Sequence, residues 1–337
     1  METVKIAEVT RKGLVESIHR GAVAVVNTKG KLLASAGDPG YLTYFRSAAK
    51  PIQAIPVVES GASTHFGLEL AEIALLTGSH NGEVKHTETA LAILRKIGLG
   101  VEYLQCGAHE PLHVPSRNAL LAKGIKPSAL HNTCSGKHAG MLTLARFRGL
   151  SLEDYYRPEH PVQQKMLQTV AEMAGLAPEQ IPVGIDGCGV PVFGLPLEKM
   201  ALAYARISAP EDHDLTETRK EACSLIRKAM TTHPFMVGGT DRFDTDLLQA
   251  SEGRLMAKFG AEGVYCVGVV EKGWGIAIKI EDGNLRALPS VTLAVLEQLG
   301  LLTVEEKEKL LGYRQKKLTN HRGDIIGEIR AVVSLKY

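Results

Sequence analysis

The sequence predicts an α+β fold in which strands and helices are segregated along the chain. Three observations lead to this prediction. Short strand-like apolar runs lie near both ends of the 337 residues, apolar spacing near 3.6 residues dominates the middle, and many helical segments stop at a glycine. We expect one antiparallel sheet from residues of about 1–45 and 250–337, and a mainly helical lobe from about 46–249.

The terminal regions carry the strand signals. The turn Thr28-Lys29-Gly30 separates two apolar runs and has glycine where a left-handed residue is needed, and Lys272-Gly273 separates two more. Each pair of runs predicts a hairpin. Strands are expected at 5–18 (one or two), 21–27, 31–36, 263–271, 274–281 and 324–335.

Apolar residues with helical spacing predict helices over most of the remaining chain, and the ends of these helices explain part of the glycine content. The chain has 34 glycines, above the usual ~7%. Helices are expected at 48–60, 67–77, 84–97, 116–123, 136–148, 160–174, 196–206, 214–231, 287–299 and 303–312. Six of them end at a glycine that fits a C-cap: Gly61, Gly78, Gly98, Gly124, Gly149 and Gly175.

Composition narrows the class of protein. There are 39 basic and 37 acidic residues with 5% aromatic residues, which argues against a dedicated nucleic-acid binder. The start METVKIAEVT has no apolar signal-peptide core, and no apolar run approaches the ~20 residues that cross a bilayer. Five cysteines without a C-x-x-C pair do not indicate a disulfide framework. We expect a cytoplasmic protein that acts on a small soluble molecule.

Ser47 and Lys50 form an S-x-x-K motif at the start of a predicted helix. Positions three apart share a helix face, so the Lys50 amine can reach the Ser47 hydroxyl and act as its base. Backbone N–H groups at the helix start can stabilise an oxyanion. Roughly one such motif is expected by chance in a chain of this composition, so the motif alone is weak evidence.

Two further motifs follow the first. Ser79, His80 and Asn81 lie in a glycine-flanked loop, where helix capping is the simpler interpretation. Lys258 lies near two glycines before a predicted strand, and this motif taken by itself is most simply interpreted as a solvated surface lysine. The order S-x-x-K, S-x-N, K-x-G is that of penicillin-recognising serine enzymes. The spacing between Ser47 and Ser79 is shorter than those enzymes have, and the expected cytoplasmic location argues against a cell-wall substrate.

Cysteines in two glycine-containing segments predict a metal site. Cys134 lies at a predicted helix start, and Cys188 could join it on a zinc ion with nitrogen from Lys137 or His138. A disulfide or two buried thiols are the alternatives. The remaining cysteines, Cys106, Cys223 and Cys266, have apolar surroundings and are expected to pack in the core.

Several of these segments together resemble the rhizobial-type L-asparaginases, also called the asparaginase II or type 3 family. The matching segments are YFRSAAKPIQ (44–53), TGSHNGE (77–83), CGAHEP (106–111), HNTCSGKHAGML (131–142), DGCGVP (186–191) and GAEGV (260–264). The resemblance implies a fold like that of serine β-lactamases and glutaminases. It also implies hydrolysis of L-asparagine to L-aspartate and ammonia, and a homodimer.

The resemblance implies roles for individual residues. Ser47 and Lys50 would form one serine–lysine pair, and Ser79 with Lys258 a second. One zinc ion per chain, assisting substrate binding, would be held by Cys134, Lys137 and Cys188. Charged groups of the substrate are expected at Arg46, His80, Asn81 or Asp186.

Two other function classes stay open. One is a glutaminase or another penicillin-recognising serine hydrolase, which would form an acyl-enzyme on a different substrate. The other is a non-catalytic, zinc-containing binding protein in which the zinc loop is structural and the serines are helix caps. Ammonia release from asparagine or glutamine separates these classes.

Overall fold

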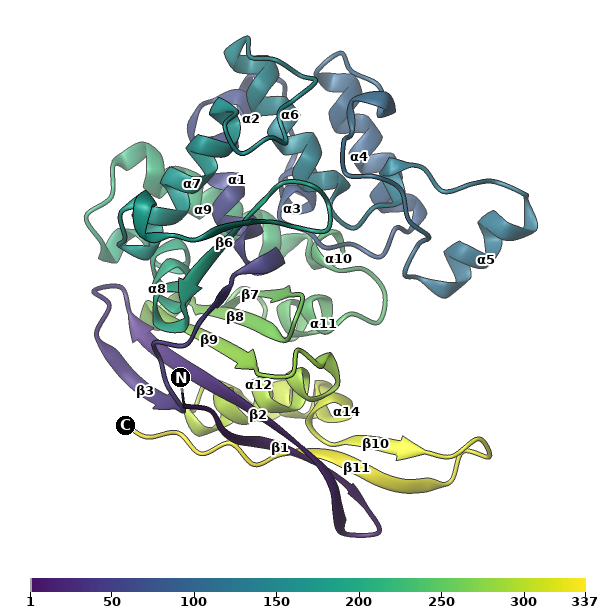
Figure 1. Cartoon of the computed structure of the whole chain (residues 1–337), viewed down its shortest axis with the longest axis vertical. Helices are drawn as coiled ribbons and strands as arrows, with labels where there is room; N and C mark the ends of the chain where they lie inside the picture. The colour runs from purple at the N-terminus through teal and green to yellow at the C-terminus, as the bar shows by residue number, and fades with distance from the viewer. Residues whose placement is uncertain (1) are drawn as a thin grey trace. The chain divides into compact units, whose positions relative to one another are not determined.

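The computed structural model describes residues 2–337, which form two compact units (Figure 1). The sheet unit contains residues 2–48, 195–209 and 246–337, and the helical unit contains residues 49–194 and 210–245. The α+β class with segregated strands and helices is confirmed. Segment 195–209, which the expected boundaries placed in the helical lobe, belongs to the sheet unit, because its helix packs against strands far away in sequence.

One antiparallel sheet of eight strands forms the sheet unit within the described residues. Its order is β10-β11-β1-β2-β9-β8-β7, with β3 also paired to β2. Val9 in β1 lies opposite Ile329 in β11, so the two ends of the chain share this sheet, as predicted. The strands are β1 (Val4–Arg11), β2 (Leu14–Asn27), β3 (Leu32–Ala36), β7 (Leu255–Gly260), β8 (Val264–Val269), β9 (Trp274–Ile280), β10 (Lys316–Thr319) and β11 (Ile325–Ala331).

Both predicted hairpins are present, but two strands of this eight-stranded sheet were not predicted. The β8–β9 connection ends at Gly273, which has φ +57°, and the β2–β3 connection contains Gly30 with φ +80°. No strand was predicted at 255–260, where Lys258 was expected only to precede a strand, yet Lys258 lies in β7 and pairs with Cys266 in β8. Strand β10 is short and exposed, so its sequence carries no alternating pattern.

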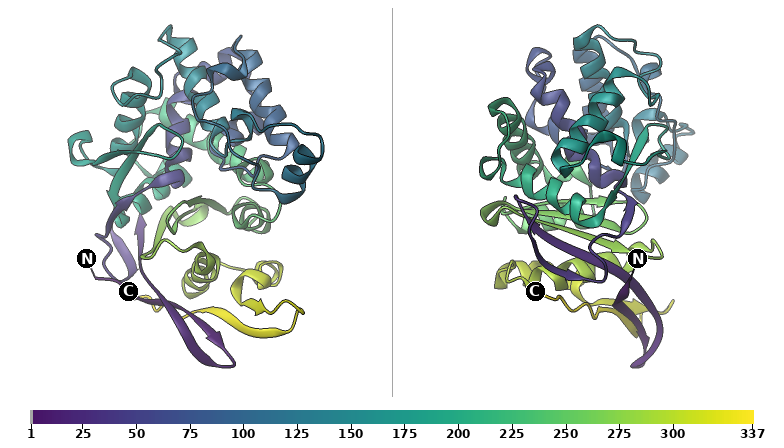
Figure 2. Two further views of the ribbon diagram at one scale, coloured as in Figure 1. Left: turned by 45° about the vertical axis from the view of Figure 1, so that its right-hand side comes forward. Right: turned by 60° about the vertical axis from the view of Figure 1, so that its left-hand side comes forward.

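Helices cover both faces of the sheet, which explains why every residue of β8 is buried. Helix α8 (Leu197–Ser208) packs on β9, β2 and β8, and α12 (Leu288–Gln298) lies on the opposite face (Figures 1 and 2). The close approach of α8 depends on glycine. A Cβ atom at Gly275 would lie 1.7 Å from the carbonyl oxygen of Ala201.

We therefore expect Gly275→Ala to lower the free energy of unfolding by about 1–3 kcal/mol or more, because α8 must move away from the sheet. Gly312→Ala is the matched control, since a Cβ there meets open space in helix α14 (Leu311–Arg314). The control is expected to leave stability unchanged or raise it by up to about 1 kcal/mol. Urea unfolding measures both, and equal stability of the two variants would contradict this packing.

The helical unit is built around two buried helices. Helix α1 (Lys50–Glu59) has eight buried residues, and the first eleven residues of α6 (Ser135–Arg148) are buried, which matches sequences that are apolar or small on all sides. The others are α2 (Ala62–His65), α3 (Leu70–Leu76), α4 (Val84–Lys96), α5 (Val114–Ala122), α7 (Pro161–Ala174), α9 (Glu217–Thr232) and α10 (Pro234–Val237).

Shorter elements complete the chain. Strands β5 (Val183–Ile185) and β6 (Pro191–Pro196) pair as a hairpin, and α11 (Phe243–Ala250) precedes β7. The helix expected at 303–312 is two short helices, α13 (Val304–Lys309) and α14. Within residues 2–337, every helix is too short or too polar to cross a bilayer.

Candidate active site

A buried lysine at the start of α1 contacts the loop that carries Ser79. Lys50 is the first residue of α1, and Pro51 follows it in the first turn, where a proline needs no N–H partner. Lys50 Nζ lies 2.5 Å from the carbonyl oxygen of Gly78, 3.0 Å from Ser79 Oγ and 3.2 Å from the carbonyl oxygen of Thr133. All of these residues belong to the helical unit.

The contact between Lys50 and Ser79 was not predicted. Helical spacing paired Lys50 with Ser47, and the family resemblance paired Ser79 with Lys258. Lys50 and Ser79 are 29 positions apart in sequence, so no local periodicity connects them. The pairing of Ser47 with Lys50 stays a prediction.

The surroundings of Lys50 favour a neutral amine. Complete burial lowers the pKa of Lys50 below its ordinary value of 10.5, and the positive charge of Lys137 lowers it further against an opposing effect of Cys134. A neutral amine has two N–H groups and one lone pair. The carbonyl oxygens of Gly78 and Thr133 can accept the two N–H groups, which leaves the lone pair for a hydroxyl such as that of Ser79.

Backbone and side-chain hydrogen bonds hold the Ser79 loop, which connects α3 to α4. The Ser79 N–H donates to the carbonyl oxygen of Val237 at 2.8 Å. The Asn81 amide donates to the carbonyl oxygen of Thr240 at 2.8 Å and accepts from Arg242 Nη1 at 2.8 Å. Both polar ends of the Asn81 side chain are thus bonded within the protein, where they fix the loop against residues 237–242.

His80 is buried in the same loop and is neutral. Burial and the neighbouring His86 ring, which stacks on it at 4.9 Å, hold the pKa of His80 well below its ordinary value of 6.5. Its Nδ1 atom accepts from the Gly82 N–H at 3.1 Å, which assigns the proton to Nε2, and Nε2 donates to Ser135 Oγ at 2.8 Å. His80 therefore links the Ser79 loop to the start of α6.

Ser47 and Lys258 both belong to the sheet unit. Ser47 lies half-buried in a single turn of 3-10 helix that precedes α1. A Cβ atom at Gly260 would lie 3.0 Å from the carbonyl oxygen of Phe45 and 3.2 Å from the Ala48 nitrogen. The end of β7 therefore abuts the turn that carries Ser47, and Lys258 lies two residues earlier on that strand.

The residues beside Ser47 and Lys258 are held in unusual or enclosed positions. Arg46 has φ +51°, a left-handed conformation that costs a non-glycine residue about 1–3 kcal/mol and must be held by its surroundings. Arg46 Nη1 lies 4.0 Å from Glu262 Oε1. Lys258 is buried, and its Nζ atom donates to the carbonyl oxygen of Phe259 at 2.9 Å.

The three residues expected to bind zinc come together in the helical unit. Cys134 is the N-cap of α6, Lys137 lies in its first turn, and Cys188 lies in the turn between β5 and β6. Lys137 Nζ donates to Cys188 Sγ at 3.2 Å, and the Cys134 thiol is hydrogen-bonded to Cys188. Both cysteines are buried and free, so they do not form the disulfide that the sequence left open as an alternative.

The electrostatic surroundings of the two cysteines favour a thiol at Cys134 and a thiolate at Cys188. The hydrogen bond from Cys134 and the Lys137 ammonium lower the pKa of Cys188 to about 5. The same hydrogen bond, together with burial, raises the pKa of Cys134 to about 12. Burial opposes the charge on Lys137, but Cys188 and Cys134 raise its pKa above the ordinary value.

This donor set fits a zinc ion. Two sulfur atoms and one nitrogen atom supply three of the four donors of a tetrahedral site. His138, the other nitrogen considered from sequence, is turned toward the Tyr155 hydroxyl, which lies 2.7 Å from its Nδ1 atom. No cluster of three His, Cys, Asp or Glu residues suited to a metal occurs within residues 2–337, so the lysine nitrogen is needed to complete this set.

Two residues around the cysteine pair were not predicted as part of the site. Cys106 was assigned to packing, and burial raises its pKa to about 12, with a further contribution from Cys134 and Cys188 that places it near them. Asn132 donates to the carbonyl oxygen of Cys106 at 2.8 Å and accepts from the Cys134 N–H at 2.8 Å. The sequence feature that could have indicated Asn132 is its position two residues before Cys134.

Asp186 closes the turn that presents Cys188. Its N–H donates to the carbonyl oxygen of Val190 at 2.9 Å, and its own carbonyl oxygen accepts from the Gly189 N–H at 2.9 Å. The half-buried Asp186 carboxylate is close enough to raise the pKa of Lys137. Asp186 therefore adds a negative charge beside the predicted metal residues.

Several solved structures are similar to this chain. Mglu in its tris and glutamate form has 14% identity and a TM-score of 0.49, with 88% of this chain and 64% of that chain covered. A β-lactamase from Mycobacterium bovis has 14% identity and a TM-score of 0.40, covering 82% and 94%. Simvastatin synthase from Aspergillus terreus has 11% identity and a TM-score of 0.39, covering 77% and 86%. This chain thus spans less than two thirds of the length of Mglu.

Family-level similarity covers almost the whole sequence. No curated protein matches the chain. The family model described as L-asparaginase II matches residues 7–331, a range that includes Ser47, Ser79, the cysteine pair and Lys258. The chain belongs to the L-asparaginase II family.

Proposed function

We propose that this protein hydrolyses the side-chain amide of L-asparagine to L-aspartate and ammonia through a serine acyl-enzyme. Membership of the L-asparaginase II family supports an amidohydrolase that acts on a small molecule. The observation that carries the mechanism is the placement of Lys50 Nζ among two carbonyl oxygens and the Ser79 hydroxyl. This placement suits an amine that accepts and returns a proton.

The first half of the reaction forms the acyl-enzyme. Ser47 Oγ attacks the amide carbon, and the neutral amine of Lys50, three residues along the chain, accepts the hydroxyl proton. Backbone N–H groups near Ser47 and near Gly260, which lie against each other in the sheet unit, stabilise the oxyanion. Each such donor typically contributes ~3–4 kcal/mol to the transition state.

The second half releases both products. Lys50, now an ammonium, donates through Ser79 to the departing nitrogen, which leaves as ammonia, and Lys258 assists Ser79 in this proton transfer. Water then attacks the β-aspartyl ester, and the proton it loses returns to Ser47 through Lys50. Aspartate is released, and the serine and the neutral lysine are regenerated.

Charged side chains hold the α-groups of the substrate in this proposal. Arg46 offers a positive charge to the α-carboxylate, and Asp186 offers a negative charge to the α-ammonium. His80 and Asn81 position the Ser79 loop, because the buried His80 ring is neutral and the Asn81 amide is bonded at both ends.

We further propose that Cys134, Lys137 and Cys188 bind one zinc ion per chain. Bound zinc would supply a Lewis acid that polarises and holds a polar group of the substrate. Metal ligands must be deprotonated. Cys188 is already a thiolate, so binding must remove one proton from Cys134 and one from Lys137.

We therefore expect about two protons to be released for each zinc ion bound near neutral pH, and zinc affinity to rise with pH. Calorimetry in buffers of different ionisation enthalpy counts these protons, and elemental analysis gives the stoichiometry. Cys134→Ala/Cys188→Ala should lose the metal, whereas Cys223→Ala, a buried cysteine elsewhere in the helical unit, should keep it. Zinc bound equally by both variants would contradict the assignment.

The proposed reaction is tested by ammonia release from asparagine, glutamine and a substrate-free blank, together with hydrolysis of a β-lactam. We expect asparagine to be the best substrate. Faster ammonia release from glutamine would identify glutamine as the preferred substrate, without contradicting the serine–lysine mechanism. Turnover of the β-lactam alone would indicate the penicillin-recognising class, and no turnover of any compound would contradict an enzymatic role.

A further inference from the structure

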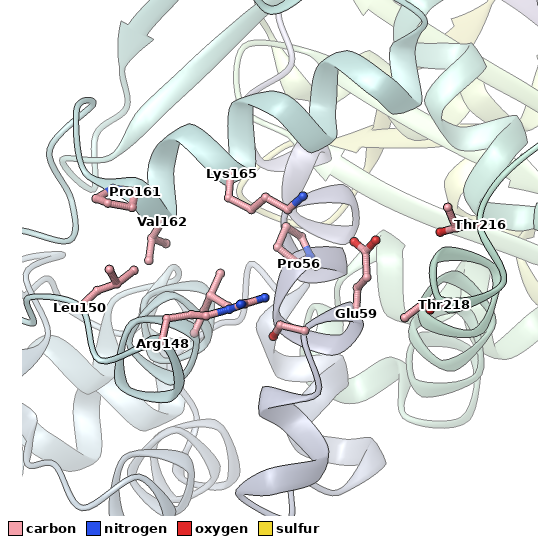
Figure 3. A pocket seen from close by; sticks show the side chains of 11 residues that line it. Pro56, Glu59, Arg148, Leu150, Pro161, Val162, Lys165, Thr216 and Thr218 are labelled. Carbon is pink, nitrogen blue, oxygen red and sulfur yellow. The ribbon is translucent and has the colours of Figure 1, made fainter.

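A cavity of about 660 Å³ lies in the helical unit at the ends of four helices (Figure 3). Its walls come from the last turns of α1 and α6 and from the beginnings of α7 and α9. This volume is within the usual range of about 300–1,000 Å³ for small-molecule sites. The residues that matter for its chemistry are Glu59, Leu144, Arg148, Val162, Lys165 and Thr216.

The cavity is separate from the candidate active site. Lys50 and Lys137 lie at the N-terminal ends of α1 and α6, whereas Glu59 and Arg148 lie at the opposite ends. At 1.5 Å per helical residue, these pairs are about 14 Å and about 17 Å apart along their helices. A ligand in the cavity would not contact Lys50 or the cysteine pair.

One part of the cavity is apolar. Leu144 and Val162 are buried side chains that reach its wall, and Leu150 and Pro161 lie beside them. Figure 3 shows Leu150, Pro161 and Val162 grouped at one end. A ligand that fills this end needs an apolar body.

The other part carries two cations without carboxylate partners. Arg148 Nη and Lys165 Nζ point into the same space beside Pro56 (Figure 3). Within residues 2–337 neither side chain takes part in an ion pair. The Arg148 guanidinium lies over the uncharged Phe147 ring, 6.0 Å from the ring centroid. Two like charges that face one solvent-filled space favour an anion between them.

The acidic residue of the lining does not neutralise these cations. The Glu59 carboxylate accepts from Arg219, whose Nε and Nη2 atoms both lie 3.0 Å from Glu59 Oε2. Arg219 is almost fully buried and also pairs with Glu172 at 3.0 Å. Glu59 is therefore committed to Arg219, and the positive charges of Arg148 and Lys165 remain available to a ligand.

We propose that this cavity binds an organic anion with an apolar body, whose carboxylate or phosphate group lies between Arg148 and Lys165. The apolar body packs against Leu144, Leu150 and Val162. Thr216, at the start of α9, lines the far side of the cavity beyond Glu59 (Figure 3), and its hydroxyl oxygen accepts from the Arg219 N–H at 3.3 Å.

Calorimetric titration of the full chain with 2-naphthoate and with 2-naphthyl phosphate tests the proposal. The neutral isostere 2-naphthamide has the same apolar body without the charge. We expect at least one of the two anions to bind about tenfold more tightly than the amide, and the stronger of the two identifies the anionic group. Equal binding of the amide, or no binding of either anion at millimolar concentration, would overturn the proposal.

Variants locate the bound probe. Arg148→Gln/Lys165→Met should weaken the preferred anion about tenfold, whereas Arg146→Gln/Lys228→Met makes the same charge change at exposed positions outside the cavity and should not. Ser79→Ala should bind the anion like the wild type. Unchanged binding in the first variant, or loss of binding in Ser79→Ala, would place the probe elsewhere and overturn the proposal.

Discussion

Ser47→Ala is expected to lower the turnover of asparagine by at least about 10³-fold, because the variant has no hydroxyl to form the acyl-enzyme. The KM should change much less than turnover, since Ser47 contributes to the transition state more than to ground-state binding. Steady-state measurement of ammonia release gives both quantities. Zinc content and the urea unfolding curve should match those of the wild type, because Ser47 is half-buried in a short turn.

Ser251→Ala is the matched control for this variant. Ser251 is a buried serine of the same sheet unit, and its hydroxyl donates only to the carbonyl oxygen of Leu248 at 3.3 Å. Turnover by this control should stay close to that of the wild type. If Ser47→Ala kept wild-type turnover while Ser79→Ala lost it, Ser79 would be the nucleophile, and Lys50 would deprotonate it directly through the observed 3.0 Å contact.

Lys50→Met is expected to reduce turnover by about 10²–10⁴-fold, because it removes the group that accepts and returns the proton. Methionine has a similar length but no N–H groups, so the carbonyl oxygens of Gly78 and Thr133 lose their donor. That loss should lower the free energy of unfolding by about 1–3 kcal/mol. Kinetics and urea unfolding together separate the loss of chemistry from the loss of stability.

The pH profile of the wild type provides an independent test of the same residue. Only neutral Lys50 can accept the serine proton, and burial lowers its pKa below 10.5. The value of kcat/KM should therefore rise with pH and level off before pH 10.5. Lys50→Met should lose this rise and keep only its residual rate. A wild-type rate that falls steadily as pH increases through this range would contradict the role of Lys50 as a base.

The segregated architecture could be predicted because it depends on local patterns. Short apolar runs located β2, β3, β8 and β9, and apolar periodicity that ends at a glycine located α6 and α7. Segment 195–209 could be predicted as a helix but not placed on the sheet. Its position depends on Gly275 leaving room for Ala201, two residues that are 74 positions apart in sequence.

The candidate site was predictable to the extent that its residues lie in recognisable motifs. Cys134, Lys137 and Cys188, which the resemblance implied as zinc ligands, lie close together, and their binding of a metal stays a prediction. The carbonyl oxygen of Thr133 was missed because every residue has a backbone carbonyl, so residue type does not indicate which one accepts a hydrogen bond. Cys106 was missed because the residues around it in the sequence are those expected around a core residue. Long-range contacts of this kind depend on how the helices pack.

The serine acyl-enzyme is tested most directly by measuring ammonia and β-aspartohydroxamate together when the wild-type protein acts on asparagine in the presence of hydroxylamine. A serine acyl-enzyme partitions between water and hydroxylamine after ammonia has left. We predict that hydroxamate forms at the expense of aspartate while ammonia release continues. Release of ammonia with no hydroxamate would indicate direct attack by water, and no ammonia at all would contradict the proposed activity.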